Sequence, residues 1–270
     1  ETDYSNDIVT ASAYRLRVPF EVRTFELTGV APEDDCFRQD ELAEAAQDAA
    51  PIPYEAAPDG SAQRRLIEQT RTLFYADDGA AALPLGTIAA RALVRQGLTL
   101  AFTPDLLTDL FGARVTDAML DEGGYVHSEG DVNWWAPTQR VEYGTPFLLP
   151  VRLVSPFGDT ASVAYDAHHL LVETAIDFVG NVTSVENDYR ILGPALQTSP
   201  NLNREAITAD ELGFAVGHAV MGKAGAGEGG SLADPPTRYR YDLTRWVGLA
   251  LPNRVRIERK EQDGAAAPAH

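Results

Sequence analysis

Apolar and polar residues follow different patterns in the two halves of the chain, and the first half mixes strand-like and helical periods. Residues 20–27 alternate between apolar and polar side chains, and residues 8–18 are rich in β-formers and tyrosine. Both segments are therefore predicted to be strands. Because Pro19 lies between them, we expect the two strands to form a hairpin around this proline.

Several segments of the first half have apolar residues at helical spacing. They cover residues 34–50, 61–72, 103–111 and 115–121. Asp40 is the expected cap of the first segment, while Thr103 and Pro104 begin the third as threonine cap and first-turn proline. The fourth segment ends at Gly123-Gly124, a sequence typical of helix ends. A short strand at residues 73–75 is expected after the second segment.

One short pattern recurs between Ser155 and Met221, in a region that is rich in β-formers from Tyr125 onward. In each copy a turn at glycine or asparagine leads to an alternating run, an aspartate and an apolar pair, which predicts two strands joined by a tight turn. Repetition at a fixed period is typical of arrays whose units bury apolar surface against their neighbours. The residues that define the pattern are Gly158, Tyr165, Asp166, Leu170, Gly180, Asp188, Tyr189, Leu192, Asp210 and Phe214.

The aspartates Asp166, Asp188 and Asp210 give the repeat a period of 22 residues. We therefore predict a mainly β fold, in which antiparallel strand-turn-strand repeats form a meandering sheet of about six strands. A few short helices are expected in the N-terminal half. The expected division lies near residue 150, between a mixed β and helical leading segment at residues 1–150 and a repeat segment at residues 151–270.

Charge and composition exclude several classes of partner. The chain has 40 acidic and 22 basic residues, and its net charge of −18 would repel nucleic-acid phosphates and anionic lipid surfaces. No apolar run is long enough to span a bilayer, so we expect neither a nucleic-acid partner nor a membrane segment. Cys36 is the single cysteine, which leaves no internal disulfide. The start of the chain lacks a signal-peptide pattern, and we interpret both ends as cuts through a longer protein.

A possible metal loop lies just before the tryptophan pair. His127, Glu129, Asp131 and Asn133 alternate through a turn that contains glycine, which is the placement of oxygen ligands in a calcium loop. The histidine stands where aspartate would suit calcium better. The alternative is an ordinary polar turn before a buried strand, the commoner role of such a loop. We therefore expect no metal ion and no cofactor, and these residues remain candidate ligands only.

Trp134 and Trp135 could form a platform for a sugar if one indole faced solvent. Adjacent strand residues point to opposite faces of a sheet. The alternative, which we favour, is that one ring fills the core and the other packs under a neighbouring element, since large aromatic side chains contribute most to burial.

A second local pattern, Gly217 to Ala224, has the spacing of a phosphate-binding loop. Ala224 stands where such a loop has serine or threonine, and we interpret this pattern as a coincidence.

The repeats resemble the YD repeats of RHS proteins, and more closely the repeat-bearing B and C components of bacterial insecticidal toxin complexes (Tc toxins). The resemblance covers most of the chain, although the third copy departs from it with Leu202 in the place of glycine. It rests on the segments Tyr165 to Leu171, Asp177 to Thr183, Asn187 to Leu192 and Val220 to Lys223, and extends to Leu100 to Pro104, Gly123 to Val126, Trp134-Trp135 and Tyr241 to Leu243.

The resemblance implies an RHS-type β-shell, in which the repeats wind a sheet around a toxic C-terminal segment that is released by self-cleavage. It implies that this chain is a structural piece of the shell wall, secreted or extracellular as part of a toxin complex. Its expected partners are other segments of the same shell, other toxin-complex components and the enclosed toxin polypeptide. Nothing in the chain matches the self-cleavage segment, so no catalytic residue is carried over and we do not expect an enzyme.

The alternative function is a carbohydrate-binding or glycoside-cleaving β domain. It is motivated by the acidic balance of the chain and by Trp134 and Trp135. A glycosidase of this kind would need two carboxylates facing each other across a cleft, about 5 to 9.5 Å apart. An exposed tryptophan above such a pair would favour this alternative over the shell.

Overall fold

The computed structural model describes residues 1–32 and 35–260, and contacts divide the chain into two compact units, Glu1–Asp159 and Thr160–His270. The division expected from the sequence lay near residue 150. Large antiparallel sheets dominate, which confirms the predicted mainly β fold. No helix among the described residues is long and apolar enough to cross a membrane.

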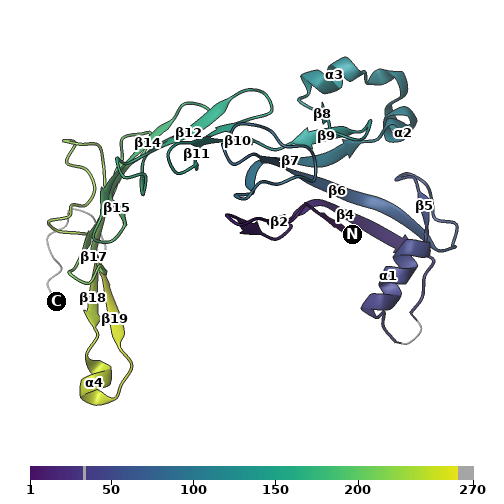
Figure 1. The fold of residues 1–270 in the computed structure, drawn as a ribbon. Helices are drawn as coiled ribbons and strands as arrows, with labels where there is room; N and C mark the ends of the chain where they lie inside the picture. The colour runs from purple at the N-terminus through teal and green to yellow at the C-terminus, as the bar shows by residue number, and fades with distance from the viewer. Residues whose placement is uncertain (33–34, 261–270) are drawn as a thin grey trace. The chain divides into compact units, whose positions relative to one another are not determined.

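A seven-stranded sheet forms the centre of the first unit (Figure 1). Its strands have the order β1-β4-β6-β7-β9-β8, and β5 pairs in parallel with one end of β6. The strands are β1 (Thr2–Tyr4), β4 (Pro19–Thr28), β5 (Ala50–Ile52), β6 (Gln63–Tyr75), β7 (Leu93–Phe102), β8 (Val126–His127) and β9 (Trp134–Pro137). The buried apolar side chains of this unit include Phe74, Leu98, Leu120, Trp134 and Trp135.

The hairpin expected around Pro19 is wrong. The preceding segment folds back on itself earlier, because β2 (Ile8–Val9) pairs with β3 (Tyr14–Arg15) across a turn. In that turn the Thr10 hydroxyl oxygen accepts a hydrogen bond of 3.0 Å from the Ala13 N–H. Serine and threonine hydroxyls stabilise turns in this way. As a result β4 is free to pair with β1 on one side and β6 on the other.

The helices of the first unit are short. They are α1 (Gln39–Asp48), α2 (Pro104–Leu106), which continues into the π-helical turn η1 (Leu107–Phe111) and the 3₁₀ turn η2 (Gly112–Arg114), and α3 (Asp117–Glu122). Thr103 caps α2 as predicted, since its hydroxyl oxygen accepts a hydrogen bond of 3.2 Å from the Leu106 N–H. The first helix forms as predicted, but its N-cap is Arg38 and not Asp40.

The helix predicted at residues 61–72 is wrong, because residues 63–72 belong to β6, the longest of the described strands. Local apolar spacing is a weak signal, and here pairing with β4 and β7 overrides it. In strand periodicity Gln69 and Arg71 share one face, and both are buried. The first unit also contains the hairpin of β10 (Arg140–Gly144) and β11 (Leu149–Val154).

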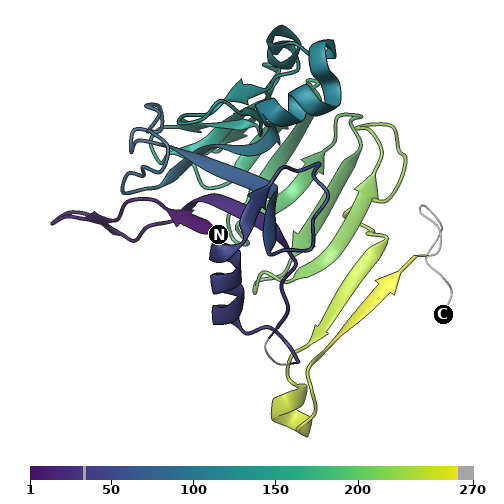
Figure 2. The ribbon, with the colours of Figure 1, turned by 90° about the vertical axis from the view of Figure 1, so that its right-hand side faces the viewer.

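The second unit is an antiparallel meander, in which each strand pairs with the next in sequence (Figure 2). The strands are β12 (Thr160–Tyr165), β13 (Val172–Ile176), β14 (Val182–Asp188), β15 (Gly193–Thr198), β16 (Arg204–Ala209), β17 (Ala215–Met221), β18 (Thr237–Asp242) and β19 (Arg254–Arg259). The strands expected from the repeats are β12 to β17. Among residues 160–260 the only helix is α4 (Arg245–Leu249), which lies at the tip of the β18–β19 hairpin (Figure 1). No helix described in this unit covers a face of its sheet.

Candidate functional site

The repeat is built from turns that begin at every eleventh residue. The first residues of these turns are Ser155, Asp166, Asp177, Asp188, Ser199 and Asp210. At Ser155, Asp177, Ser199 and Asp210 the backbone N–H donates to the carbonyl oxygen four residues later, with N···O distances of 2.8 to 3.1 Å. The period of 22 residues seen in the sequence is therefore two strand-turn units.

Aspartate side chains hold these turns closed. Asp177 Oδ1 accepts hydrogen bonds from the N–H groups of Val179 and Asn181, at 3.0 and 2.9 Å. Asp210 Oδ1 accepts equivalent bonds from Leu212 and Phe214, at 3.0 and 2.9 Å. Short polar side chains that satisfy backbone donors in this way favour turns over continued strand. Asp177 and Asp210 thus set where β13 and β16 end.

A left-handed residue completes most of the turns. Gly158, Gly180 and Gly213 have φ angles of 92°, 86° and 85°. Leu202, which departs from the sequence pattern, nevertheless adopts φ 65° at the same turn position. A left-handed conformation costs an ordinary L-residue roughly 1–2 kcal/mol. The fold of the third copy is therefore imposed by the neighbouring strands against a local preference.

Asp166 links one repeat to the next. Its side chain is only 2% exposed, and its Oδ2 accepts a hydrogen bond of 2.7 Å from the hydroxyl of Tyr189 in the following copy. Its Oδ1 accepts bonds from the N–H groups of His168 and Leu170, at 3.1 and 2.9 Å. The His168 ring also contacts the Tyr189 ring edge-on. This carboxylate therefore closes its own turn and ties that turn to its neighbour.

The remaining residues of the sequence pattern lie at the turns and strand ends. Tyr165 ends β12, and Asp188 binds the Arg190 guanidinium with a closest N···O distance of 2.6 Å. Leu170 and Leu192 are exposed at the turns. The Phe214 ring lies 4.9 Å from that of Tyr241. Besides the Asp166–Tyr189 bond, the Phe214–Tyr241 contact thus also joins a pattern residue to another element, β18.

The pKa of Asp166 is lowered although the side chain is buried. Desolvation raises this pKa, but hydrogen bonds from the Leu170 N–H, the Tyr189 hydroxyl and the His168 and Leu171 N–H groups outweigh it. The same contact raises the pKa of Tyr189, chiefly because its hydroxyl proton is held by the carboxylate. The ionised form of Asp166 is therefore the form that the fold stabilises.

We expect the Asp166→Asn variant to be less stable than the wild type near neutral pH, and this difference to narrow below about pH 4. The carboxylate has a lower pKa in the folded than in the unfolded state. The carboxylate therefore contributes fully to the free energy of unfolding above its unfolded-state pKa of about 3.9. This contribution disappears as the pH falls through its pKa in the folded state. Urea unfolding at a series of pH values measures the difference. Asp159→Asn, at an exposed turn residue, is the matched control and should show no such narrowing.

The candidate metal loop is occupied by protein contacts. Asp131 Oδ1 accepts hydrogen bonds from the Asn133 N–H and from Trp135 Nε1, at 2.9 and 3.1 Å. Glu129 Oε2 accepts a bond of 2.9 Å from the Leu85 N–H. His127 Nδ1 lies 2.9 Å from the Asn133 carbonyl oxygen. Among residues 1–32 and 35–260, no group of three or more histidine, cysteine, aspartate or glutamate side chains is placed to hold a metal ion. The loop's oxygens instead stabilise its own fold.

Arg71 is the centre of this loop's contacts, and the sequence did not indicate it. Its Nε donates to Glu21 Oε2 at 2.6 Å, and its Nη1 donates to Ser128 Oγ at 2.7 Å. Asp131 Oδ2 lies 2.8 Å from the same Nη1, in an ion pair without the geometry of a hydrogen bond. Gln69 Nε2 donates to the other Glu21 oxygen at 2.9 Å. We call these residues the Arg71 cluster: Glu21, Gln69, Arg71, Ser128, Asp131 and Trp135.

Because residues 61–72 have apolar residues at helical spacing, the sequence does not indicate the Arg71 cluster. A helix would not place Gln69 and Arg71 on one face, whereas a strand does. Buried charges are stable only when paired and hydrogen-bonded, and the cluster meets this condition with the carboxylates of β4 and of the β8–β9 loop. The polar groups of the cluster bind one another, so the cluster stabilises the fold of the first unit.

The possible sugar platform is not present. Trp134 and Trp135 are 4% and 0% exposed, so neither indole offers a ring face to solvent. The His127 ring lies against Trp134, with 4.0 Å between centroids, and the Arg71 guanidinium carbon lies 4.2 Å from the Trp135 ring centroid. Both rings therefore pack within the unit. The segment from Gly217 to Ala224 does not form a phosphate-binding loop. Such a loop lies between a strand and a helix, whereas here the strand Ala215–Met221 is followed by another strand, β18.

No protein-family model and no curated protein sequence matches the chain, whereas several solved structures do. The crystal structure of TcdB2-TccC3 matches with a TM-score of 0.63 and 19% identity, over 94% of this chain and 13% of that chain. The crystal structure of TcdB2-TccC3-Cdc42 matches with a TM-score of 0.60 and 19% identity, over 91% of this chain and 13% of that chain.

A third match is the Photorhabdus luminescens Tc holotoxin pore, with a TM-score of 0.58 and 23% identity, over 81% of this chain and 10% of that chain. The chain thus spans between 10% and 13% of the length of these solved chains. The likeness concerns the fold, and it extends over both units. The chain therefore has the fold of a segment of Tc toxin structures, in agreement with the resemblance seen in its sequence.

Proposed function

We propose that the chain is a non-catalytic wall segment of an RHS-type β-shell, which encloses a toxin polypeptide in an extracellular toxin complex. The observation that carries this proposal is the row of turns at every eleventh residue, with Asp166 and Tyr189 joining successive copies. A repeat of this kind extends a sheet by equal steps, and each step stabilises the next. The fold likeness to Tc toxin structures supports the same function.

The sheet of the second unit suits contact with another polypeptide. Ile176 and Val182 are cross-strand partners, and both remain exposed. Val255 and Ile257 on β19 are exposed as well. Single exposed apolar side chains are common on any surface, but on strands they can hold an unfolded or extended chain by weak contacts. In the proposed shell the repeats supply area and rigidity, and the enclosed toxin and the neighbouring wall segments are the partners.

The test is protection of the enclosed polypeptide from protease. In the complete polypeptide that contains these residues, the proposed cargo should resist digestion under conditions that degrade an unprotected cargo. The Asp166→Ala variant, which removes the contact between repeats, should make the cargo more sensitive. Asp159→Ala changes an exposed turn aspartate and should leave protection intact. A cargo that is digested equally in the wild type and in free form would contradict the proposal.

The carbohydrate alternative has no support from the geometry. It was motivated by the acidic balance of the chain and by Trp134 and Trp135, and both tryptophans are buried. The carboxylates nearest to Trp135 in the Arg71 cluster are bound to arginine and do not face an open cleft. We therefore do not propose carbohydrate binding or cleavage.

A further inference from the structure

The sheet of the first unit has a gap along one edge of β6. On that edge β6 pairs with β5 from Gln63 to Arg65, and with β7 from Thr70 to Tyr75. Between these two stretches, Leu66, Glu68 and Gln69 pair only with β4, on the opposite edge, and Ile67 lies at a β-bulge without a strand partner. β7 pairs with β6 no further than Thr99, and on its other edge it pairs with β9, where Trp135 lies opposite Leu100. Four residues of β6 therefore lack a strand partner on this edge.

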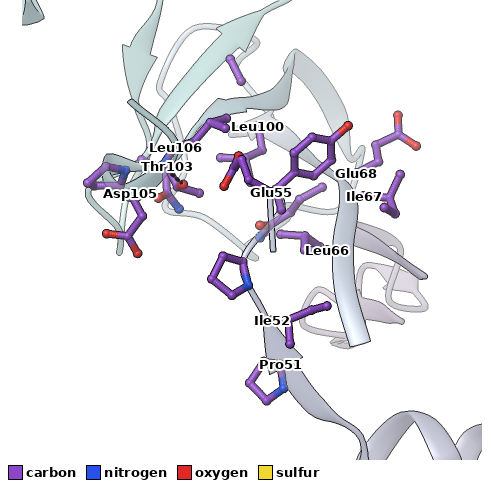
Figure 3. Close-up of a pocket in the computed structure, with 16 residues that line it drawn as sticks. Pro51, Ile52, Glu55, Leu66, Ile67, Glu68, Leu100, Thr103, Asp105 and Leu106 are labelled. Atoms are coloured by element: carbon purple, nitrogen blue, oxygen red, sulfur yellow. Dashed lines mark hydrogen bonds between the residues drawn. The ribbon is translucent and has the colours of Figure 1, made fainter. Parts of the chain in front are cut away.

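A groove of about 740 Å³ lies at this gap. Figure 3 shows Leu66, Ile67 and Glu68 on one wall and Thr103, Asp105 and Leu106 on the other. Apolar side chains, among them Ile52, Leu66, Leu100 and Leu106, line much of its surface. A volume of this size is typical of sites that bind small ligands, and it is large enough to take in a few side chains.

Hydrogen bonds fix both ends of the groove. The Arg65 guanidinium donates to the carbonyl oxygens of Tyr54 and Ala56, at 2.6 and 2.7 Å. These bonds fix the loop after β5, which forms one end of the groove. On the other side, the Thr103 cap fixes the start of α2. A pre-formed site avoids part of the entropy that binding would otherwise cost.

The rim of the groove is acidic. Glu55, Glu68 and Asp105 are exposed lining residues, and the lining contains no lysine, arginine or histidine. Within the described parts of the chain, no side-chain partner occupies these carboxylates. Tyr54, which is 55% exposed, adds an aromatic face at the same end. Carboxylates and an exposed aromatic ring are complementary to a cationic side chain.

We propose that the groove binds an extended polypeptide segment of a partner, in which basic and apolar side chains alternate. The segment adds a short strand to the open edge at residues 66–69, so that its backbone hydrogen-bonds with β6. Its apolar side chains enter the groove beside Leu66 and Leu100, and its lysine or arginine side chains meet Glu55 and Glu68. Main-chain bonds supply affinity in this mode of recognition, and alternate side chains supply specificity. The inference does not depend on the shell function.

The test measures binding of synthetic peptides to the full chain by fluorescence anisotropy. A short peptide of alternating lysine and valine should bind, and its counterpart of alternating glutamate and valine should bind at least about tenfold more weakly. A lysine–valine peptide that is N-methylated at alternate residues, so that one edge cannot donate hydrogen bonds, should also lose about tenfold or more in affinity. This comparison leaves the protein unchanged, so it is independent of any effect on folding.

Charge reversal locates the site. The double variant Glu55→Arg and Glu68→Arg should weaken binding of the lysine–valine peptide about tenfold. Glu122→Arg, at an exposed residue of α3 outside the groove, is the matched control and should leave the affinity unchanged. The proposal is overturned by absent binding, by equal affinity for the methylated peptide, or by an equal loss in the Glu122→Arg control.

Discussion

Replacing Arg71 by leucine is expected to lower the free energy of unfolding of the first unit by about 3–5 kcal/mol. The substitution removes the cation that faces Glu21 and Asp131, while Glu21 is only 6% exposed. A buried carboxylate without its partner bears most of the cost of desolvation. Arg23 and Gln69 still bind Glu21, but no other cation in the described residues pairs with Asp131. Urea unfolding, followed by the fluorescence of the buried tryptophan pair, measures the change.

The matched control is Arg95→Leu. Arg95 lies on β7, is partly buried, and makes no described side-chain hydrogen bond or ion pair. Its substitution should change the free energy of unfolding by no more than about 0.5 kcal/mol, as is usual away from such contacts. A loss below about 1 kcal/mol in Arg71→Leu would contradict the role given to the cluster, because it would mean that both carboxylates are satisfied without arginine.

The Trp135→Ala variant is expected to lose about 3–5 kcal/mol in the free energy of unfolding of the same unit. Trp135 is fully buried, its ring lies over the Arg71 guanidinium, and its indole N–H donates to Asp131. Truncation removes a large apolar contact, leaves a cavity and takes one hydrogen bond from a carboxylate. Circular dichroism during urea unfolding measures the loss without relying on tryptophan fluorescence.

Trp246→Ala is the control for this variant. Trp246 lies on α4 in the second unit and is 67% exposed, so its truncation should leave stability nearly unchanged. If Trp135→Ala were as mild as Trp246→Ala, the tryptophan would not be a core residue. The effects of Trp135→Ala and Arg71→Leu should not add, because the two side chains are in contact.

The repeats and the cap of α2 could be predicted from the sequence because their causes are local, whereas the cap of α1 is Arg38 and not the predicted Asp40. The turns at Asp166, Asp188 and Asp210 depend on side chains that satisfy backbone donors within a few residues. The Thr103 cap of α2 is equally local. Strand pairing between successive copies then follows from chain connectivity, because short turns join antiparallel neighbours. For this reason the meander and its period were predictable without a structure.

Predictions failed where the deciding contacts are distant in sequence. Residues 61–72 have apolar spacing that suits a helix, but β4 pairs along one edge of this segment, and β5 and β7 pair with the two ends of the other edge, which makes it a strand. The strand after Val18 likewise pairs with β6, about 45 residues away, rather than with its predecessor. Hydrogen bonds in a sheet are made between segments, so local periodicity carries little information about them.

The candidate sites show the same division between local and tertiary causes. The sequence by itself determined the acidic balance, the turn aspartates and the 22-residue period, since each depends on composition or on neighbours along the chain. Only the tertiary structure decided that Asp131 pairs with Arg71, that both tryptophans are buried, and that the edge of β6 is open beside an acidic groove. Burial and charge pairing depend on which distant segments meet, and that is fixed only when the sheet assembles.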